Sequence, residues 1–476
     1  MKKKTKKNKS AYFIGIKGVG MTMLAQFFKS QGRQVSGSDI NDEFLTDEVL
    51  RRYHIPVFSP FAAENIPDNS DIIVHSSAFN SVNNPELKFI SEHKKKFLSV
   101  PVLSYAQALG LEFNRHRGIA VCGSHGKTTT TAWLGYVLER SGHNPNVLVG
   151  SRVPQFKGSG LSGRSPYLIA EVDEYQNKMR FFSPQGVVLN NIDYDHPDYF
   201  PTESSYVAVF RKFVKKIPST GWLVINNDDA KAKKLSRYCL GQVLSYSLDE
   251  KSSQADYVAF DLKPLGNHFS FQLYYRGHDQ GKFTISLVGR HNVYNALAVI
   301  AAARQLGVSW KNIFLHLRGF KGTARRCQIL GRYQGATIID DYAHHPAEIK
   351  ATLSALRERW PHDRLITVFH PHTFSRTKAL FPDFVSSFSQ SDELFILDVY
   401  SSARESSKTE AKTISRDLAE AITRFNKQAK IKQEVRAVST IKQVSYILKP
   451  RLKNGDRLIL MGAGDVFRLA QLLLNK

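Results

Sequence analysis

The segment Gly118–Thr131, with the sequence GIAVCGSHGKTTTT, constrains the fold of this 476-residue chain more than any other. Its first part, Ile119–Cys122, is a short apolar run with β-branched residues, which is typical of a buried strand. Two glycines, a lysine and four threonines follow, and the apolar residues after them recur at helical spacing. A strand, a glycine-rich turn and a helix N-terminus in this order predict a loop whose backbone N–H groups bind polyphosphate.

This loop offers specific groups to a bound nucleotide. Lys127 is expected to reach the β- and γ-phosphates, and the Thr128 hydroxyl is expected to ligate Mg²⁺. The spacing is Gly-x-x-Gly-Lys-Thr, because Val121 stands where the longer P-loop motif has its first glycine. The predicted nucleotide contacts are Gly123, Ser124, His125, Gly126, Lys127, Thr128 and Thr129.

Charge and cysteine content narrow the class of protein. The formal net charge is +24, and six of the first nine residues are lysines, so residues 1–10 are predicted to form a basic tail. A basic chain favours anionic partners such as nucleotides, sugar phosphates or nucleic acid. The three cysteines are widely spaced and form no C-x-x-C pair, which argues against a disulfide framework or a zinc site and suits the cytoplasm. No apolar run is long enough to predict a membrane span.

An N-terminal unit, residues 11–115, shows the alternation of a nucleotide-binding domain. Its expected elements are a strand over 12–16, a helix over 21–31 and strands over 34–38 and 72–76. Gly15, Gly18 and Gly20 join the first strand to the helix, and Asp39 ends the next strand. These glycines run G-x-x-G-x-G rather than G-x-G-x-x-G, so the turn favours a diphosphate at the helix N-terminus over a dinucleotide.

A central unit, residues 116–324, contains the phosphate loop and two strands that end in acidic residues. The strand that begins at Tyr167 ends in Glu171, Asp173 and Glu174, and the strand that begins at Gly186 leads to Asp and His residues. Carboxylates at strand ends beside a phosphate loop are where an α/β sheet places Mg²⁺ ligands, although solvated loop charges would give the same pattern.

A third unit, residues 325–476, again alternates strands and helices, which predicts a parallel sheet with helices on both faces. Its expected strands begin at Ala336, Arg364, Glu393 and Arg457. His344 and His345 follow the first of these strands. Adjacent histidines in a strand point to opposite faces, so contact with substrate or phosphate is favoured over shared metal ligation.

Taken together, these blocks resemble the Mur ligases, the ATP-dependent amino-acid ligases of peptidoglycan assembly. Gly123–Thr131 resembles the ATP loop of that family, and Glu171–Glu174 resembles its acidic metal-binding segment. Asn190–His196 is similar to the segment with the metal-binding histidine, and His291–Ala296 to the asparagine helix near the nucleotide. The matches span nearly the whole chain.

Within the family, four segments are most similar to the members that add L-alanine to UDP-N-acetylmuramate. They cover residues 15–21, 340–348, 370–377 and 461–465. Tyr175 and Gln176 depart from that pattern, and the tyrosine is more similar to members that add recycled murein tripeptide to the same nucleotide sugar. A third hypothesis is a P-loop protein that binds nucleic acid through its basic surface, but no RRM, KH or helix-turn-helix signature supports it.

The resemblance implies an α/β chain of three domains: a Rossmann-like N-terminal unit, a central P-loop ATP-binding sheet and a Rossmann-like C-terminal domain. It implies that ATP phosphorylates the lactoyl carboxylate of UDP-N-acetylmuramate and that the amine of L-alanine attacks the acyl phosphate. ATP and Mg²⁺ are the implied cofactors, nucleic acid is not an implied partner, and a cytoplasmic monomer or weak homodimer is expected.

The resemblance also implies roles for individual residues. Catalysis is assigned to Lys127, His196 and Arg376, and metal binding to Thr128, Glu171 and His196. The further nucleotide contacts are Asn292, Asn295, Arg325 and Arg326. The uridine diphosphate contacts are Gly15, Gly18, Gly20, Asp39, Ser76 and Ser77, and the residues facing the amino acid are Asp341, His344 and His345.

Overall fold

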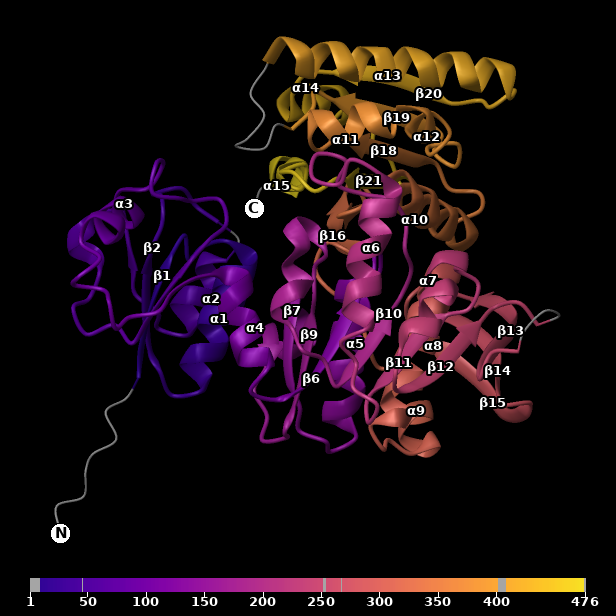
Figure 1. Cartoon of the computed structure of the whole chain (residues 1–476). Helices are drawn as coiled ribbons and strands as arrows, with labels where there is room; N and C mark the ends of the chain where they lie inside the picture. The colour runs from indigo at the N-terminus through magenta and orange to yellow at the C-terminus, as the bar shows by residue number, and fades with distance from the viewer. Residues whose placement is uncertain (1–8, 45, 251–253, 267, 401–407, 475–476) are drawn as a thin grey trace.

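The computed structural model describes residues 9–44, 46–250, 254–266, 268–400 and 408–474. Three sheets follow one another along the chain, each flanked by helices, and the middle one lies between the other two domains (Figure 1). No helix in the described part of the chain combines the length and apolar character that a membrane span requires. The predicted α/β class with three domains is confirmed.

The N-terminal sheet has the strand order β3-β2-β1-β4-β5, and its strands pair in parallel. Its elements are β1 (Ser10–Ile14), α1 (Val19–Ser30), β2 (Gln34–Ser38), α2 (Asp47–Arg52), β3 (Val57–Phe58), η1 (Ala63–Asn65), β4 (Ile72–His75), α3 (Pro85–Glu92), β5 (Val102–Ser104) and α4 (Tyr105–Phe113). The strand β1 ends two residues earlier than the predicted strand over 12–16. The reason is Gly15, whose φ of 81° turns the chain out of the extended conformation.

The central sheet has ten strands in the order β15-β14-β13-β12-β11-β10-β6-β9-β7-β8. Up to β12, its elements are β6 (Arg117–Cys122), α5 (Lys127–Arg140), β7 (Asn146–Val153), η2 (Pro154–Phe156), β8 (Gly158–Leu161), β9 (Tyr167–Glu171), η3 (Tyr175–Phe181), β10 (Gly186–Leu189), α6 (Glu203–Val214), β11 (Trp222–Asn226), α7 (Ala230–Leu235), η4 (Ser236–Tyr238) and β12 (Gln242–Ser247). The remaining elements are β13 (Tyr257–Leu265), β14 (His268–Tyr275), β15 (His278–Ile285), α8 (Arg290–Gln305) and α9 (Trp310–Leu317).

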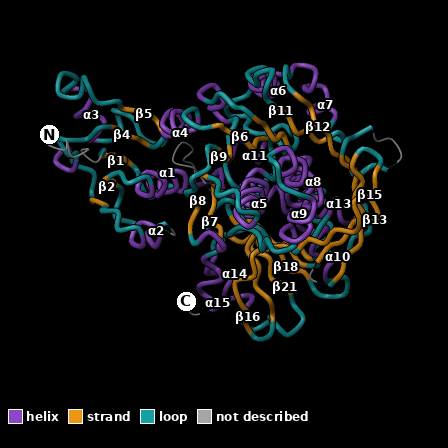
Figure 2. The backbone as a smooth tube through the Cα atoms, turned by 90° about the horizontal axis from the view of Figure 1, so that it is seen from below, coloured by secondary structure: helices purple, strands orange, loops and turns teal. Residues whose placement is uncertain are grey.

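This sheet curves around α5, α8 and α9, which lie side by side against one face (Figure 2). The large buried side chains of that face include Trp133, which stacks on Phe320 at a centroid distance of 5.3 Å. The strands β13, β14 and β15 form an antiparallel extension at one edge. The phosphate-loop helix α5 is therefore packed between the sheet and the helices α8 and α9 by apolar side chains.

The C-terminal sheet has the order β16-β17-β21-β18-β19-β20. Its elements are β16 (Gln328–Tyr333), β17 (Ala336–Asp341), α10 (Pro346–Arg359), β18 (Leu365–Phe369), α11 (Phe374–Ala379), α12 (Phe381–Val385), β19 (Glu393–Leu397), α13 (Lys408–Gln428), β20 (Glu434–Val438), α14 (Ile441–Leu448), β21 (Arg457–Met461) and α15 (Arg468–Leu474). Helices cover both faces, as predicted, over two separate apolar clusters. The strand β16 is the exception to a parallel sheet, because it pairs antiparallel with β17 as a hairpin.

The N-terminal and central domains share one apolar core. The helix α1 packs on β7 and β8, and the cluster runs from Phe27 of α1 to Leu148 of β7. The helix α4 joins the same cluster, where Phe113 meets Phe182 edge to face at 5.3 Å. The two domains are therefore joined by buried side chains as well as by the chain itself.

Candidate active site at the junction of the three domains

The phosphate loop is shaped by two glycines with positive φ. The strand β6 ends at Cys122, Gly123 has φ 127°, and Gly126 has φ 76° as the N-cap of α5. A Cβ atom at Gly126 would collide with the side-chain oxygen of Asn295 in α8. Glycine is therefore required here both by the backbone conformation and by the closeness of α8.

Lys127 folds back over this loop. Its Nζ donates to the carbonyls of Gly123 and Ser124 at 2.5 and 3.0 Å and lies 3.3 Å from Oε2 of Glu174. Burial alone would lower the pKa of Lys127, but Glu174 and the neighbouring carboxylates outweigh it and the pKa is raised. Lys127 is therefore held as a cation at the N-terminus of α5, as charge neutralisation of a phosphoryl group requires.

Thr128 and Glu171 form one candidate Mg²⁺ group. The Thr128 hydroxyl lies 3.0 Å from each carboxylate oxygen of Glu171, and Gly150 N donates to Oε2 at 3.0 Å. A hydroxyl and a carboxylate beside a phosphate loop are the oxygen donors that Mg²⁺ uses together with phosphate oxygens. This donor set fits Mg²⁺.

His196 belongs to a second, neighbouring group. Ligand atoms of Asp173, Glu174 and His196 lie within 4.8 Å of one another. The Tyr175 ring lies 4.5 Å from the His196 ring, and its hydroxyl donates to Asp198 at 2.7 Å. The three residues predicted to bind metal are thus divided between two adjacent groups, Thr128 with Glu171 and His196 with two further carboxylates.

Arg376 crosses from the C-terminal to the central domain. Its Nε and Nη2 donate to the two oxygens of Asp195 at 2.9 and 3.3 Å, and both side chains are buried. Burial alone would raise the pKa of Asp195, but Arg376 outweighs it and holds the pKa well below the ordinary value. The pair is a bidentate ion pair between two domains.

A cavity of about 950 Å³ lies at the meeting point of the three domains. Val19, in the N-terminal glycine turn, lines it, as do Lys127, Glu171 and His196 of the central domain and Arg376 of the C-terminal domain. The predicted residues Ser124, Gly126, Thr128, Arg325, Arg326 and His344 also line it. The structure therefore brings the two metal groups, the lysine and the interdomain arginine to one cavity.

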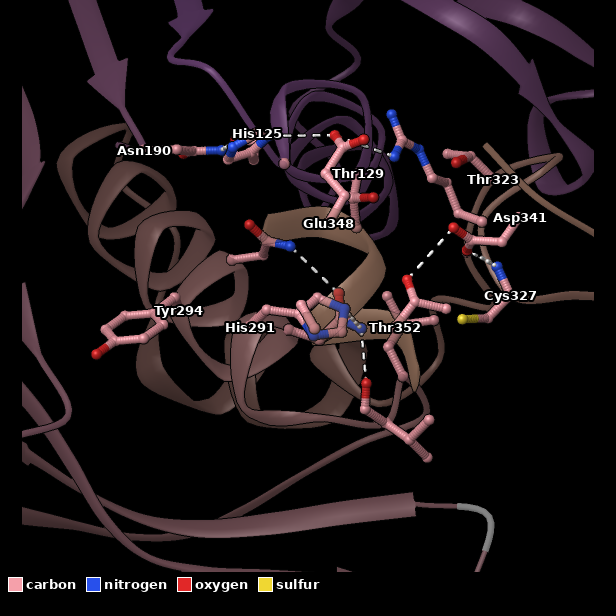
Figure 3. A pocket seen from close by; sticks show the side chains of 18 of the residues that line it. His125, Thr129, Asn190, His291, Tyr294, Thr323, Cys327, Asp341, Glu348 and Thr352 are labelled. Carbon is pink, nitrogen blue, oxygen red and sulfur yellow. Dashed lines mark hydrogen bonds and ion pairs between the residues drawn. The ribbon is translucent and has the colours of Figure 1, made fainter. Parts of the chain in front are cut away.

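A second cavity, of about 480 Å³, lies on the other side of the phosphate loop, between α8 and α10 (Figure 3). Asn292 and Asn295 line it together with His125, Gly126 and Thr129. Arg326 lines both cavities. The predicted nucleotide contacts are thus divided between the two cavities, because Ser124, Lys127, Thr128 and Arg325 line only the larger one.

The three residues predicted to face an amino acid do not lie together. His344 lines the larger cavity, whereas Asp341 lines the smaller one. The Asp341 carboxylate accepts hydrogen bonds from Cys327 N, Ala343 N and the Thr352 hydroxyl at 2.7, 2.9 and 3.3 Å.

His345 is buried, and its Nδ1 accepts the N–H of Ala347 as the N-cap of α10. Burial lowers the pKa of His344 to about 3, so its imidazole is neutral at physiological pH. Of the three predicted residues, only His344 presents its side chain to the larger cavity.

The N-terminal turn is fixed by its own acidic residue. The Asp39 carboxylate accepts Lys17 N at 2.7 Å and Ile40 N at 2.8 Å, and it is 4% exposed. Lys17 turns away from the glycines, because its Nζ donates to the carbonyl of Asp42 at 2.7 Å. Gly15 and Gly18 lie between β1 and α1, Gly20 lies in the first turn of α1, and Ser76 and Ser77 follow β4 at the same edge of the sheet.

Sequence reasoning did not select Glu348, the carboxylate nearest to the phosphate loop from the C-terminal domain. Its Oε1 lies 3.2 Å from Nδ1 of His125. Asp193 and Asp195 were also not selected, although both lie in a segment that the sequence had singled out. The signal for Asp195 was its place beside His196, whereas a contact between residues 125 and 348 has no local signal.

Three α/β domains around a phosphate loop with carboxylates at strand ends define a P-loop nucleotide-dependent enzyme. Family models narrow this class. The Mur ligase family catalytic domain matches residues 10–125, the Mur ligase middle domain residues 121–303, and the Mur ligase glutamate ligase domain residues 325–464. The chain belongs to the Mur ligase family and is an ATP-dependent ligase. The resemblance drawn from the sequence is confirmed.

Curated relatives match over nearly the full length. The UDP-N-acetylmuramate–L-alanine ligase of Desulfitobacterium hafniense is 38% identical over 97% of this chain and 99% of that protein. The ligase of the same name from Caldanaerobacter subterraneus is 36% identical over 99% and 98%. Among solved structures, the UDP-N-acetylmuramate-alanine ligase of Thermotoga maritima has a TM-score of 0.80 at 23% identity and 98% coverage of both chains. A murein peptide ligase of Psychrobacter arcticus has a TM-score of 0.71 at 22% identity and the same coverage, and both likenesses establish the fold.

Proposed function

We propose that this chain joins L-alanine to the lactoyl carboxylate of UDP-N-acetylmuramate with consumption of ATP, as a step of peptidoglycan precursor synthesis in the cytoplasm. The observation that carries the proposal is the 38% identity to a curated UDP-N-acetylmuramate–L-alanine ligase over 97% of this chain. The large cavity supports it, because groups from three domains meet there, as a reaction of three substrates requires.

In this proposal each domain binds one reactant. The N-terminal turn (Gly15, Gly18 and Gly20) binds the uridine diphosphate, the phosphate loop binds ATP, and the C-terminal loop with His344 faces L-alanine. Bound ATP supplies the phosphoryl group that converts the carboxylate into an acyl phosphate. Lys127 neutralises the phosphoryl group during transfer, and Arg376 lies where the C-terminal domain meets the central one.

We assign Mg²⁺ to Thr128 and Glu171, because their donors are oxygens beside the phosphate loop. A second cation would be held by His196 with the carboxylates next to it. These residues would hold Mg²⁺ at the phosphate loop, where it would supply charge neutralisation for phosphoryl transfer. Arg376 already neutralises the neighbouring Asp195.

The test is phosphate release from ATP by the purified full-length chain with UDP-N-acetylmuramate and one amino acid at a time. L-Alanine should stimulate release more than glycine or L-serine, and omission of Mg²⁺ should abolish it. Stimulation by murein tripeptide but not by alanine would instead make this chain a recycling ligase. Release without any nucleotide sugar would contradict both assignments.

A further inference from the structure

Glu348 is the side chain through which the C-terminal domain reaches the phosphate loop. It lies in the first turn of α10, and its side chain is 10% exposed. Its Oε1 is 3.2 Å from Nδ1 of His125 (Figure 3). Its Oε2 accepts the backbone N–H of His344 at 3.2 Å. One carboxylate therefore contacts both the ATP loop and the loop that leads to the larger cavity.

His125 is charged in this arrangement. Its Nδ1 faces Glu348, and its Nε2 lies 3.2 Å from Oδ2 of Asp193, so both nitrogens meet carboxylate acceptors. A histidine donates from both nitrogens only as an imidazolium. Burial alone would lower the pKa of His125, but Asp193 and Glu348 outweigh it and raise the pKa to about 9. Three more basic groups face the pair: the His345 ring, 4.8 Å from that of His125, and Arg326 and Nδ1 of His344, 3.7 and 3.4 Å from Glu348.

The same cluster is compact enough to hold a cation, since ligand atoms of His125, Asp193 and His345 lie within 4.8 Å of one another. Its hydrogen bonds favour a proton instead. Nδ1 of His345 accepts the N–H of Ala347 at 3.3 Å, and its Nε2 is 3.3 Å from the carbonyl oxygen of Tyr194. Both ring nitrogens of His345 therefore already make hydrogen bonds. Only His125 and Asp193 would then remain as metal ligands in this cluster, which is too few for a metal site.

We propose that Glu348 is a positioning residue for the ligase reaction: paired with the His125 imidazolium, it aligns the phosphate loop with the acceptor-side loop of the C-terminal domain. This inference goes beyond the proposed function, because it requires only that both loops contribute to catalysis. The pairing joins residues of two domains, so it exists only when these domains are together.

The pairing has a defined pH dependence. Glu348 raises the His125 pKa only when the domains are together, so protonation of His125 favours the joined arrangement. This contribution is complete below the His125 pKa of the separated arrangement and is lost as the pH rises through about 9. Asp193 belongs to the same domain as His125, so its share of the rise does not depend on closure.

The first experiment is a double-mutant cycle with Glu348→Gln, His125→Gln and the double variant. Glu358→Gln is the matched control, because Glu358 is exposed on the same helix. Each single variant should raise KM for the amino acid about tenfold, and Glu348→Gln should do so with little change in KM for ATP. The double variant should lose no more than the worse single variant. A loss in the double variant equal to the product of the single losses would overturn the pairing.

The second experiment is X-ray scattering of the full-length chain between pH 7.5 and 10. The radius of gyration of the unaltered chain and of Glu358→Gln should increase as the pH passes about 9. Glu348→Gln should give the larger radius at every pH. Superimposable profiles for the unaltered chain and Glu348→Gln would contradict the proposal. So would binding of Zn²⁺ at pH 7.5 that His125→Gln abolishes, since the cluster would then be a metal site.

Discussion

The two junctions of the central domain are built from different side chains. Towards the N-terminal domain, one apolar cluster continues from Phe27 of α1 to Leu148 of β7. Towards the C-terminal domain the contacts are polar, and they include the Arg376–Asp195 ion pair and the hydrogen bond between His125 and Glu348. Within the described part of the chain, no apolar cluster joins the central and C-terminal sheets.

This difference indicates which domain moves. The free energy of an apolar contact depends on the buried area and changes little with pH or salt. An ionic contact requires a specific partner of opposite charge, and dissolved salt weakens it. The N-terminal domain should therefore stay attached to the central domain, and the C-terminal domain should open and close. Because Lys127 and Arg376 lie in different domains, closure should be needed for activity.

Arg376→Ala should have the largest effect on the polar junction. It leaves Asp195 buried without its partner, a change that typically costs about 3–5 kcal/mol. We expect kcat/KM to fall by about two orders of magnitude or more, and the radius of gyration with ATP analogue and nucleotide sugar to exceed that of the unaltered chain. An unchanged radius and near-normal kinetics would mean that the two domains are held together by other contacts.

Phe27→Ala tests the apolar junction between the N-terminal and central domains, with the radius of gyration measured as for Arg376→Ala. Phe27 is 2% exposed, so its truncation should lower the free energy of unfolding by about 3–5 kcal/mol, as measured by urea denaturation. The radius of gyration of the folded protein should not change. A larger radius of gyration with an unchanged free energy of unfolding would mean that the N-terminal domain also opens. The apolar and polar junctions would then behave alike.

Lys127→Ala distinguishes an effect on phosphoryl transfer from an effect on domain closure. It should lower kcat by about 10²–10³-fold, equivalent to about 3–4 kcal/mol of transition-state stabilisation. Unlike Arg376→Ala, it should leave the radius of gyration unchanged, because the hydrogen bonds described for the Lys127 side chain are to residues of its own domain. A near-normal kcat would remove the basis for assigning ATP to this loop.

Gly18→Val should have the smallest effect and should act only on the N-terminal side. Gly18 has φ −57°, and the nearest atom to a Cβ there would be the Gly15 carbonyl oxygen at 3.6 Å, so the variant should fold. Its branched side chain would keep a diphosphate away from the backbone and weaken UDP-N-acetylmuramate binding about tenfold, or about 1.4 kcal/mol. Calorimetry should find ATP affinity unchanged. The reverse result would mean that the two nucleotide sites are assigned the wrong way round.

The sequence predicts the strands of the sheet interiors well. The predicted bounds of β2 (Gln34–Ser38) and the predicted start of β21 at Arg457 agree with the structure, because each strand is a short run next to turn-forming residues. The hairpin of β16 and β17 was not predicted, since a strand with exposed and half-buried positions gives little hydrophobic signal. The division into α/β units follows from local pattern, whereas the direction of an edge strand depends on its partner.

The site was predictable where its residues share one segment. Lys127 and Thr128 follow from the glycine loop, and Glu171 follows from its place at the end of a strand. The contact between His125 and Glu348 joins residues 223 positions apart, so only the folded chain reveals it. Asp39 was predictable as an acidic strand end, but its use as an acceptor for the Lys17 N–H depends on the path of the turn.

The apolar core shared by the N-terminal and central domains has a consequence for the entropy of the proposed reaction. The glycine turn after β1 and the phosphate loop after β6 lie on two domains that this core joins. The two nucleotides that we propose to bind there would therefore be kept at a nearly fixed separation. Two of the three reactants then behave as groups of a single molecule, for which effective concentrations of about 10⁵–10⁸ M are attainable when the geometry is right. The translational freedom of the amino acid is the part that remains to be lost when the C-terminal domain closes.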